Sequence, residues 1–255
     1  MRSFDDLVAE AEAADVSGWD FSWLDGRATE ERPGWGYQRL LAERLGTVGA
    51  ALDIQTGGGE VLAGALDAAA AVPRVLAATE SWPPNLAKAT AALGARGGVV
   101  VADPDEPPLP FADGAFELVT SRHPVRAHWG EITRVLRPGG SYLGQHVGPE
   151  SAFELIEEFL GPLGAAARRG RHPDDEAAAA RAAGLEVVDL RTARLRMEFR
   201  DIGAIVWILR KVIWWVPGFT VAEHLGTLRA LDARMRHDGP FVAHSSRHLI
   251  EARRG

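Results

Sequence analysis

The chain has 255 residues, of which 46% are hydrophobic, and it carries a formal net charge of -7. This length and apolar content allow a substantial core, folded as one large α/β domain or two small ones. The absence of cysteine excludes disulfides, thiolate metal sites and catalytic thiols. The acidic balance does not favour binding to nucleic acid through general charge.

The first part of the chain indicates an accessory arm, which we assign to residues 1–48. Residues 5–14 have a helical composition, residues 17–37 form a loop-like stretch rich in tryptophan, and a short helix is expected over 38–45. The acidic N-terminal stretch lacks the apolar core of a signal peptide, so we expect a cytoplasmic protein.

From residue 50 onward, short apolar runs alternate with alanine-rich stretches. Strands that alternate with helices at this spacing predict βαβ units and a parallel sheet that is buried on both faces. The RPGG stretch at 137–140 ends one of these helices and turns the chain into the next strand.

The last third of the chain adds helices and two predicted strands, near 185–199 and 241–252. An alanine-rich helix is expected to begin with Asp174 or Asp175 as its cap. Residues 200–238 are interpreted as a helical cap inserted between the last strands. Its apolar stretch is interrupted by charges and is too short to span a membrane. We therefore expect a single domain over 1–255.

A turn of three consecutive glycines, Gly57 to Gly59, follows the first predicted strand of the sheet. Such a turn implies a sharp bend or the close approach of a ligand. It lacks the last glycine of the dinucleotide fingerprint, because Leu62 stands there, and no Walker lysine follows. No Lys or Arg lies between positions 51 and 73, while Asp53 and Glu60 flank the turn, which suits a cationic ligand. Alternatively, Glu60 only complements the helix dipole.

Two further acidic residues follow the next strands of the pattern. Glu80 ends the second strand, where a carboxylate accepts hydrogen bonds from ribose hydroxyls. Asp103 follows the third strand and is placed to hold an adenine amino group, although aspartate before proline is also a common start of a turn.

These residues resemble the class I S-adenosylmethionine-dependent methyltransferases. The stretch ALDIQTGGGE is similar to the first motif of that family, LPFADGAFELVTS to its fourth-strand motif and ITRVLRPGGSYLGQ to its fifth-strand motif. The resemblance runs from about 50 to 147 and implies an α/β, Rossmann-like fold. That fold has a mostly parallel seven-stranded sheet, helices on both faces and an antiparallel terminal hairpin. Gln55 departs from the pattern, because the family usually has glycine there.

The resemblance implies S-adenosylmethionine as cofactor and S-adenosylhomocysteine as product. S-adenosylmethionine carries a sulfonium and an ammonium group and no phosphate, which agrees with a glycine turn that lacks basic residues. The cofactor-binding residues predicted on this basis are Tyr37, Asp53, Gln55, Thr56, Gly57, Gly59, Glu80, Ser81, Trp82, Asp103 and Ser121.

His123, directly after the fourth strand, is the candidate general base, because its intrinsic pKa suits proton transfer near neutrality. The alternative is a loop histidine bonded to the backbone. Tryptophans are concentrated in the arm and in the late apolar segment, where the resemblance implies the acceptor pocket. Ordinary core packing is the alternative for both groups. For Trp214 and Trp215, contact with a membrane surface is a further alternative. The predicted substrate pocket consists of Trp23, Trp35, His146, Trp207 and Trp214.

His244 and His248 lie on one face of the last predicted strand, but a third ligand at diagnostic spacing is missing, so we predict no metal site. Together, these residues and the resemblance predict a methyltransferase that acts on a small, apolar or aromatic organic acceptor. A cofactor-binding protein without turnover, an RNA or protein methyltransferase and an NAD-dependent oxidoreductase are left open as alternatives. We expect no nucleic-acid or membrane partner, and the sequence gives no oligomeric state.

Overall fold

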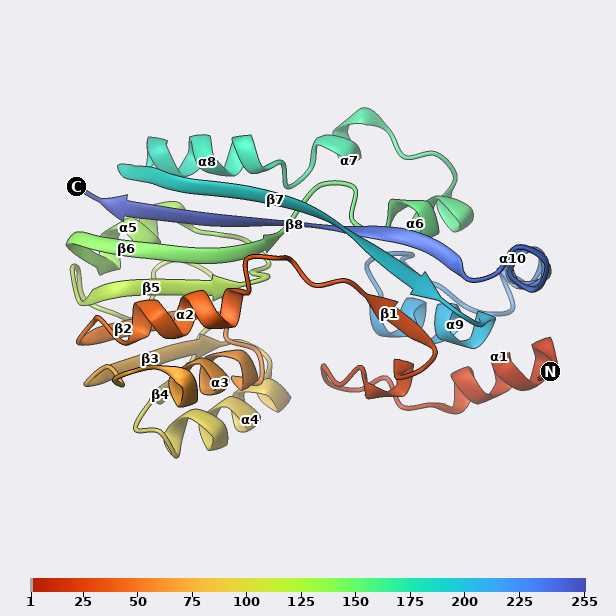
Figure 1. The fold of residues 1–255 in the computed structure, drawn as a ribbon, viewed down its shortest axis with the longest axis horizontal. Helices are drawn as coiled ribbons and strands as arrows, with labels where there is room; N and C mark the ends of the chain where they lie inside the picture. Colours follow the sequence, from red (N-terminus) through yellow and green to blue (C-terminus); the bar gives the residue numbers. More distant parts are fainter. Residues whose placement is uncertain (1) are drawn as a thin grey trace. The chain divides into compact units, whose positions relative to one another are not determined.

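The computed structural model describes residues 2–255, whose strands form one eight-stranded sheet in the order β1-β7-β8-β6-β5-β2-β3-β4 (Figure 1). The strands are β1 (Ala28–Glu30), β2 (Ala50–Ile54), β3 (Val75–Glu80), β4 (Val99–Ala102), β5 (Phe116–Arg122), β6 (Leu136–Val147), β7 (Leu185–Phe199) and β8 (Phe241–Arg254). The helices are α1 (Phe4–Ala13), α2 (Tyr37–Leu45), α3 (Glu60–Ala68), α4 (Pro83–Gly94), α5 (Trp129–Val135), α6 (Phe153–Leu160), α7 (Ala165–Arg169), α8 (Pro173–Ala182), α9 (Ile202–Lys211) and α10 (Leu225–Asp238), with a short 3-10 turn at Ser22–Leu24.

The chain divides into two compact units. The larger unit contains residues 33–149, 171–193 and 247–255, and the smaller unit contains residues 1–32, 150–170 and 194–246. The long strands β7 and β8 each begin in one unit and end in the other.

The larger unit contains the predicted parallel sheet. β2 pairs in parallel with β3 and with β5, so that Leu52 lies opposite both Ala77 and Val119. β4 and β6 extend the parallel sheet, and β8 pairs antiparallel with β6. The strand order reverses between β2 and β5, which is where α/β sheets bind ligands at the carboxyl ends of their strands.

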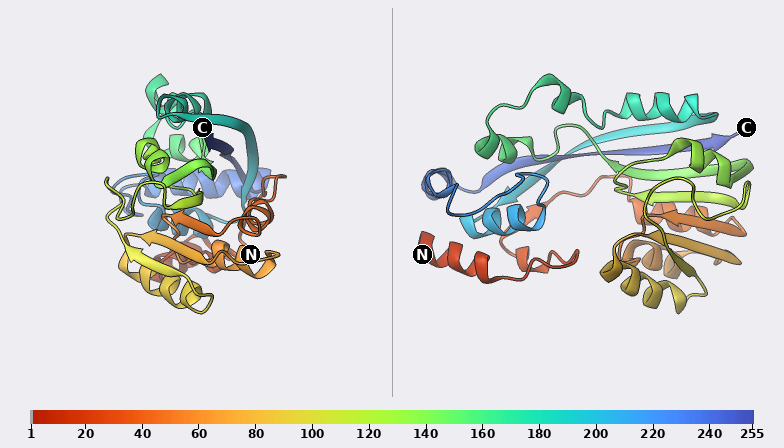
Figure 2. Two further views of the ribbon diagram at one scale, coloured as in Figure 1. Left: turned by 90° about the vertical axis from the view of Figure 1, so that its left-hand side faces the viewer. Right: turned by 180° about the vertical axis from the view of Figure 1, so that it is seen from behind.

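Alternate residues of these strands enter two separate cores, one on each face of the sheet. Leu118 and Leu143 pack with α2, α3 and α4, whereas their neighbours Val119 and Tyr142 pack with α5 and α8. α2 crosses in front of the strands in Figure 1, and α5 comes to the front in the view from behind in Figure 2. Successive side chains point to opposite faces, and both faces are covered by helices, so the strands are apolar on both faces.

The predicted Rossmann-like fold is confirmed, with two local corrections. The sheet has eight strands instead of seven, because residues 28–30 of the loop-like arm pair antiparallel with β7 as β1. Its sequence, Ala-Thr-Glu, is half-exposed or exposed and held by backbone pairing, so no apolar alternation marks it. The α8 helix begins at Pro173, and its N-cap is His172 instead of an aspartate; Asp174 and Asp175 occupy the first turn.

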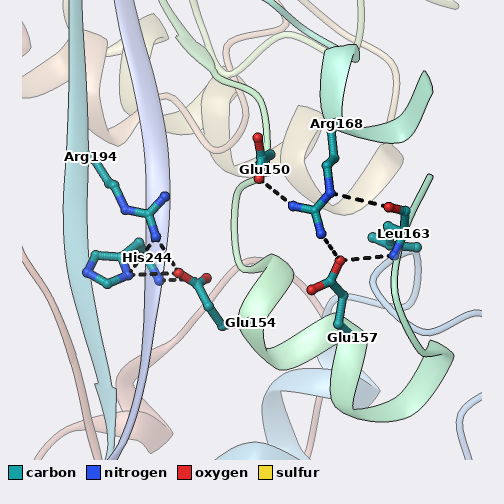
Figure 3. A network of polar contacts seen from close by, with 7 residues as sticks. All are labelled: Glu150, Glu154, Glu157, Leu163, Arg168, Arg194 and His244. Atoms are coloured by element: carbon teal, nitrogen blue, oxygen red, sulfur yellow. Dashed lines mark hydrogen bonds and ion pairs between the residues drawn. The ribbon is translucent and has the colours of Figure 1, made fainter. Parts of the chain in front are cut away.

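The smaller unit has its own apolar core around α9, whose Trp207 is 1% exposed. The α1 helix begins with a capping box between Ser3 and Asp6 and contributes Leu7 and Ala11 to that core. In Figure 3, Arg168 lies between Glu150 and Glu157, which anchors α7 to the first turns of α6. Within residues 2–255, the longest apolar helices fall short of what is needed to cross a membrane.

Candidate functional site

A pocket opens in the larger unit at the carboxyl ends of β2 and β5, the place where the strand order reverses. Of the residues predicted from sequence, Gln55 and Ser121 line it. Sequence reasoning missed Asp105, Arg126 and His128. Asp105 lies in the loop after β4 and Arg126 in the loop after β5, and His128 is the N-cap of α5. The other lining residues are Ile54, Glu106, Pro107, Leu109, Pro124, Ala127, Glu131 and Ile132.

The glycine turn next to this pocket requires glycine for two separate reasons. Gly57 and Gly59 have φ of +65° and +80°, the left-handed region that L side chains rarely adopt. A Cβ on Gly59 would also lie 3.2 Å from the Cα of Ala89, so a side chain there would push α4 away from α3. The turn therefore bends the chain sharply and brings two helices together.

Glu80, at the end of β3, holds this turn. Its Oε2 accepts a hydrogen bond of 2.8 Å from the backbone N–H of Gly57, and its Oε1 accepts one of 2.9 Å from that of Trp82. Burial raises the pKa of Glu80, and these two backbone bonds oppose the rise. The backbone of Ser81 also bonds to this carboxylate. A carboxylate has about four acceptor positions, so the group that fixes the loop still has one for a hydroxyl donor.

Asp53 and Asp103 are both buried near the same edge, at 6% and 5% exposure. Asp53 accepts a 2.6 Å hydrogen bond from the hydroxyl of Thr120, and its burial raises its pKa to about 6. Asp103 accepts a 3.0 Å hydrogen bond from the backbone N–H of Asp105, which closes the turn after β4. This contact agrees with the alternative that Asp103 starts a turn, while its contact with an adenine amino group stays a prediction.

Gln55 connects two loops at the mouth of the pocket. It has φ of +55°, and its side chain accepts from the N–H of Val125 at 2.6 Å and donates to the carbonyl of Arg126 at 3.3 Å. The departure from glycine at this position thus has a structural role: it ties the loop after β2 to the loop after β5.

Thr56, Ser81 and Trp82 complete this edge of the sheet. The backbone N–H of Thr56 donates to the carbonyl of Thr79, and Trp82 is the N-cap of α4 with 38% of its surface exposed. Ser81, which directly precedes Trp82, is exposed.

His123 is half-buried beside Gln145. Gln145 accepts from the indole N–H of Trp35 at 2.8 Å, so its amide nitrogen donates to Nε2 of His123 at 3.1 Å. His123 must therefore carry its proton on Nδ1, and burial together with the nearby Arg122 holds its pKa well below its usual value. The ring is neutral at pH 7, but Gln145 already occupies the lone pair that a general base would use.

A buried series of hydrogen bonds leads away from the pocket and joins Tyr37, Ser121, Tyr142 and His146. The hydroxyl of Tyr37 donates to the carbonyl of Ser121 at 3.1 Å, so its polar end is occupied by the sheet. The Ser121 hydroxyl lies 2.5 Å from that of Tyr142, which lies 2.7 Å from Nε2 of His146. His146 is 2% exposed and does not line the pocket itself.

The tryptophans predicted for the acceptor pocket fall into different units. Trp35 is in the larger unit, bonded to Gln145. In the smaller unit Trp23 stacks on Trp207 with ring centroids 5.5 Å apart, and Trp214 is 59% exposed and packs edge-on against Trp19. The role of Trp23, Trp207 and Trp214 in an acceptor pocket stays a prediction.

Comparison with known proteins agrees with this geometry. Residues 52–144 match the family model described as a methyltransferase domain. A solved structure from Bacillus halodurans, described by inference as a methyltransferase, is 19% identical with a TM-score of 0.57, over 85% of this chain and 97% of that one. No curated protein sequence matches the chain.

Two further solved structures show the range of proteins that share the fold. The 4+2 cyclase SpnF is 18% identical with a TM-score of 0.52, over 98% of this chain and 93% of that one. A phosphoethanolamine N-methyltransferase 2 from Haemonchus contortus, in complex with phosphomonomethylethanolamine and S-adenosylhomocysteine, is 18% identical with a TM-score of 0.51, over 100% of this chain and 60% of that one.

The strand order, the glycine turn and the similarity to these solved structures show a Rossmann-like methyltransferase fold. Within it, residues 52–144 are the part of the chain that matches the methyltransferase-domain model.

Proposed function

We propose that this protein is an S-adenosylmethionine-dependent methyltransferase that acts on a small organic acceptor with an apolar or aromatic surface. The observation that carries the proposal is the carboxylate of Glu80, which holds the N–H of Gly57 at the end of β3, where a carboxylate can also accept from a ribose hydroxyl.

The charge around the turn supports this cofactor over a dinucleotide. Asp53, Glu80 and Asp103 place buried carboxyl groups at this edge, and Glu60 opens α3. A pyrophosphate at the start of α3 would meet the charge of Glu60, whereas a sulfonium with an ammonium group is attracted by it. The NAD-dependent oxidoreductase is therefore the weaker alternative.

The pocket lining combines apolar and polar side chains. Six of its thirteen residues are apolar, among them Ile54, Leu109 and Ile132, and the others are polar or charged, among them Arg126 and His128. Sites for small molecules combine an apolar wall with a few polar groups in this way. Methyl transfer is an in-line displacement in which the protein chiefly aligns acceptor and cofactor.

Two alternatives differ from this proposal: a protein that binds the cofactor without turnover, and a methyltransferase that acts on RNA or protein. The similarity to SpnF, described as a cyclase, is one reason to measure turnover separately from binding, because a shared fold does not determine the reaction.

The experiment for this proposal replaces Glu80. We expect Glu80→Ala to weaken S-adenosylmethionine binding by about 1–3 kcal/mol, roughly 5- to 150-fold, since hydrogen bonds to a charged group and the anchor of the turn are both lost. Calorimetric titration measures it, with Glu43→Ala, an exposed residue paired with Arg39 on α2, as the matched control. Equal affinity of a folded Glu80→Ala variant and the wild type would remove Glu80 from the site.

A further inference from the structure

Three side chains that can bind a metal meet on one face of the sheet in the larger unit. His146 on β6 lies directly opposite His248 on β8, and Glu176 reaches them from α8. The Oε2 atom of Glu176 contacts Nδ1 of His146 and lies 3.1 Å from Nε2 of His248. These three atoms lie within 4.8 Å of one another, so they converge on a single point.

Burial distinguishes this cluster from the histidines on the surface. His146 and His248 are only 2% and 1% exposed, whereas the side chain of Glu176 retains 23% exposure. The carboxylate of Glu176 is therefore the part of the cluster that solvent reaches, while both imidazole rings are enclosed by the protein.

We propose that His146, Glu176 and His248 bind a divalent transition-metal cation of the zinc class. Two imidazole nitrogens and one carboxylate oxygen form a donor set that suits zinc, cobalt or iron(II), whereas calcium and magnesium require mainly oxygen ligands. Three protein ligands leave a further coordination position for water, and the partly exposed side of Glu176 is the route by which a cation would enter.

The surroundings of His146 fit this role. When Nδ1 binds a metal, Nε2 must carry the proton, and the hydroxyl of Tyr142 lies 2.7 Å away to accept it. Gly144, between the two residues on β6, makes that contact possible, because a Cβ there would lie 2.6 Å from Nε2 of His146.

The surroundings of His248 fit less well. Its Nδ1 is buried and has no hydrogen-bond partner among the described residues, so metal binding would leave an unpaired N–H there. Without a cation, Glu176 accepts from both rings and the lone pair of that Nδ1 is unpaired instead. The two states therefore place the ring protons on different nitrogens, which an experiment can distinguish.

The test uses tag-free full-length protein that has been dialysed against a chelator. ZnCl₂ is titrated in competition with a chromophoric chelator, and CoCl₂ is added to a second sample for its visible absorption. We expect one zinc per chain and a cobalt spectrum of low coordination number. The ¹⁵N shifts of labelled histidine should move the proton of His146 from Nδ1 to Nε2 on binding.

Variants assign the binding to the cluster. Glu176→Gln should weaken zinc binding by at least about 100-fold, and Tyr142→Phe by roughly 10-fold, the usual range for a residue that orients a ligand. Glu154→Gln is the matched control, since Glu154 is also a helix glutamate bonded to a β8 histidine, His244, at 2.8 Å.

The outcomes are clear and independent of the cofactor. Absence of stoichiometric zinc and of a cobalt spectrum in folded wild-type protein would overturn the proposal, as would equal zinc affinity in Glu176→Gln. Either result would leave Glu176 as a hydrogen-bond acceptor for both rings, and neither would affect the proposed methyltransferase activity.

Discussion

Asp53 illustrates how one residue of the site lowers the stability of the protein. Its pKa is raised to about 6, whereas an aspartate in the unfolded chain titrates near 3.8. Below the lower value Asp53 is neutral in both states and has no effect. As pH rises through both values, ionisation of the buried group costs free energy that the unfolded chain does not pay, so its unfavourable contribution is complete above about pH 7.

We therefore expect Asp53→Asn to raise the free energy of unfolding at pH 7.5 by an amount on the order of 1–3 kcal/mol, and by almost nothing at pH 3.5. Urea unfolding of both proteins across this range measures the difference. A gain that is independent of pH would show that ionisation of Asp53 is not its cause.

At Gln55, the strain of a left-handed backbone can be separated experimentally from the two hydrogen bonds of the side chain. Gln55→Ala loses both side-chain hydrogen bonds and keeps the left-handed backbone, so it should lower stability by about 1–2 kcal/mol. Gln55→Gly loses the same bonds but is relieved of the backbone penalty, so it should lie between the alanine variant and the wild type.

Hydrogen exchange at the amide of Val125 gives the local readout for both Gln55 variants. The amide loses its partner in each, and its exchange should accelerate by roughly fivefold or more, which corresponds to about 1 kcal/mol. Unchanged exchange at Val125 in both variants would mean that Gln55 does not hold the loop after β5.

At the scale of the element, β6 contains a glycine in the interior of a central strand, which is normally unfavourable. A Cβ at Gly144 would lie 2.4 Å from the hydroxyl oxygen of Tyr142, closer than such atoms can approach. Gly144→Ala should therefore destabilise the protein by about 1–3 kcal/mol through overpacking.

A double-mutant cycle shows whether this clash is the cause. Tyr142→Phe removes the closest atom while it keeps the edge-on contact with Trp129, so Gly144→Ala should cost less in that background. Equal costs in both backgrounds would place the effect of Gly144 elsewhere on the strand.

At the scale of the whole molecule, the sequence predicts what local patterns determine. Runs of alternating strands and helices predict the parallel sheet of the larger unit. The carboxyl ends of its strands lie at one edge, and there Glu80 and the turn at Gly57 are joined by a hydrogen bond of 2.8 Å, while their role toward a cofactor stays a prediction.

Contacts between distant segments were not predictable in this way. Glu176 meets His146 and His248 across sequence separations of 30 and 72 residues, through the register of β6 with β8 and the packing of α8. Sequence spacing instead associated His248 with His244, which contacts Glu154. The smaller unit is likewise assembled from three separate segments, a division that no local pattern marks.

The central claim is that the glycine turn and Glu80 bind S-adenosylmethionine. Calorimetric titration of the wild-type protein with S-adenosylmethionine, S-adenosylhomocysteine and NAD tests it most directly. We expect binding of the first two with a Kd on the order of micromolar, about -8 kcal/mol, and no binding of NAD. Binding of NAD alone, or of none of the three by folded protein, would contradict it.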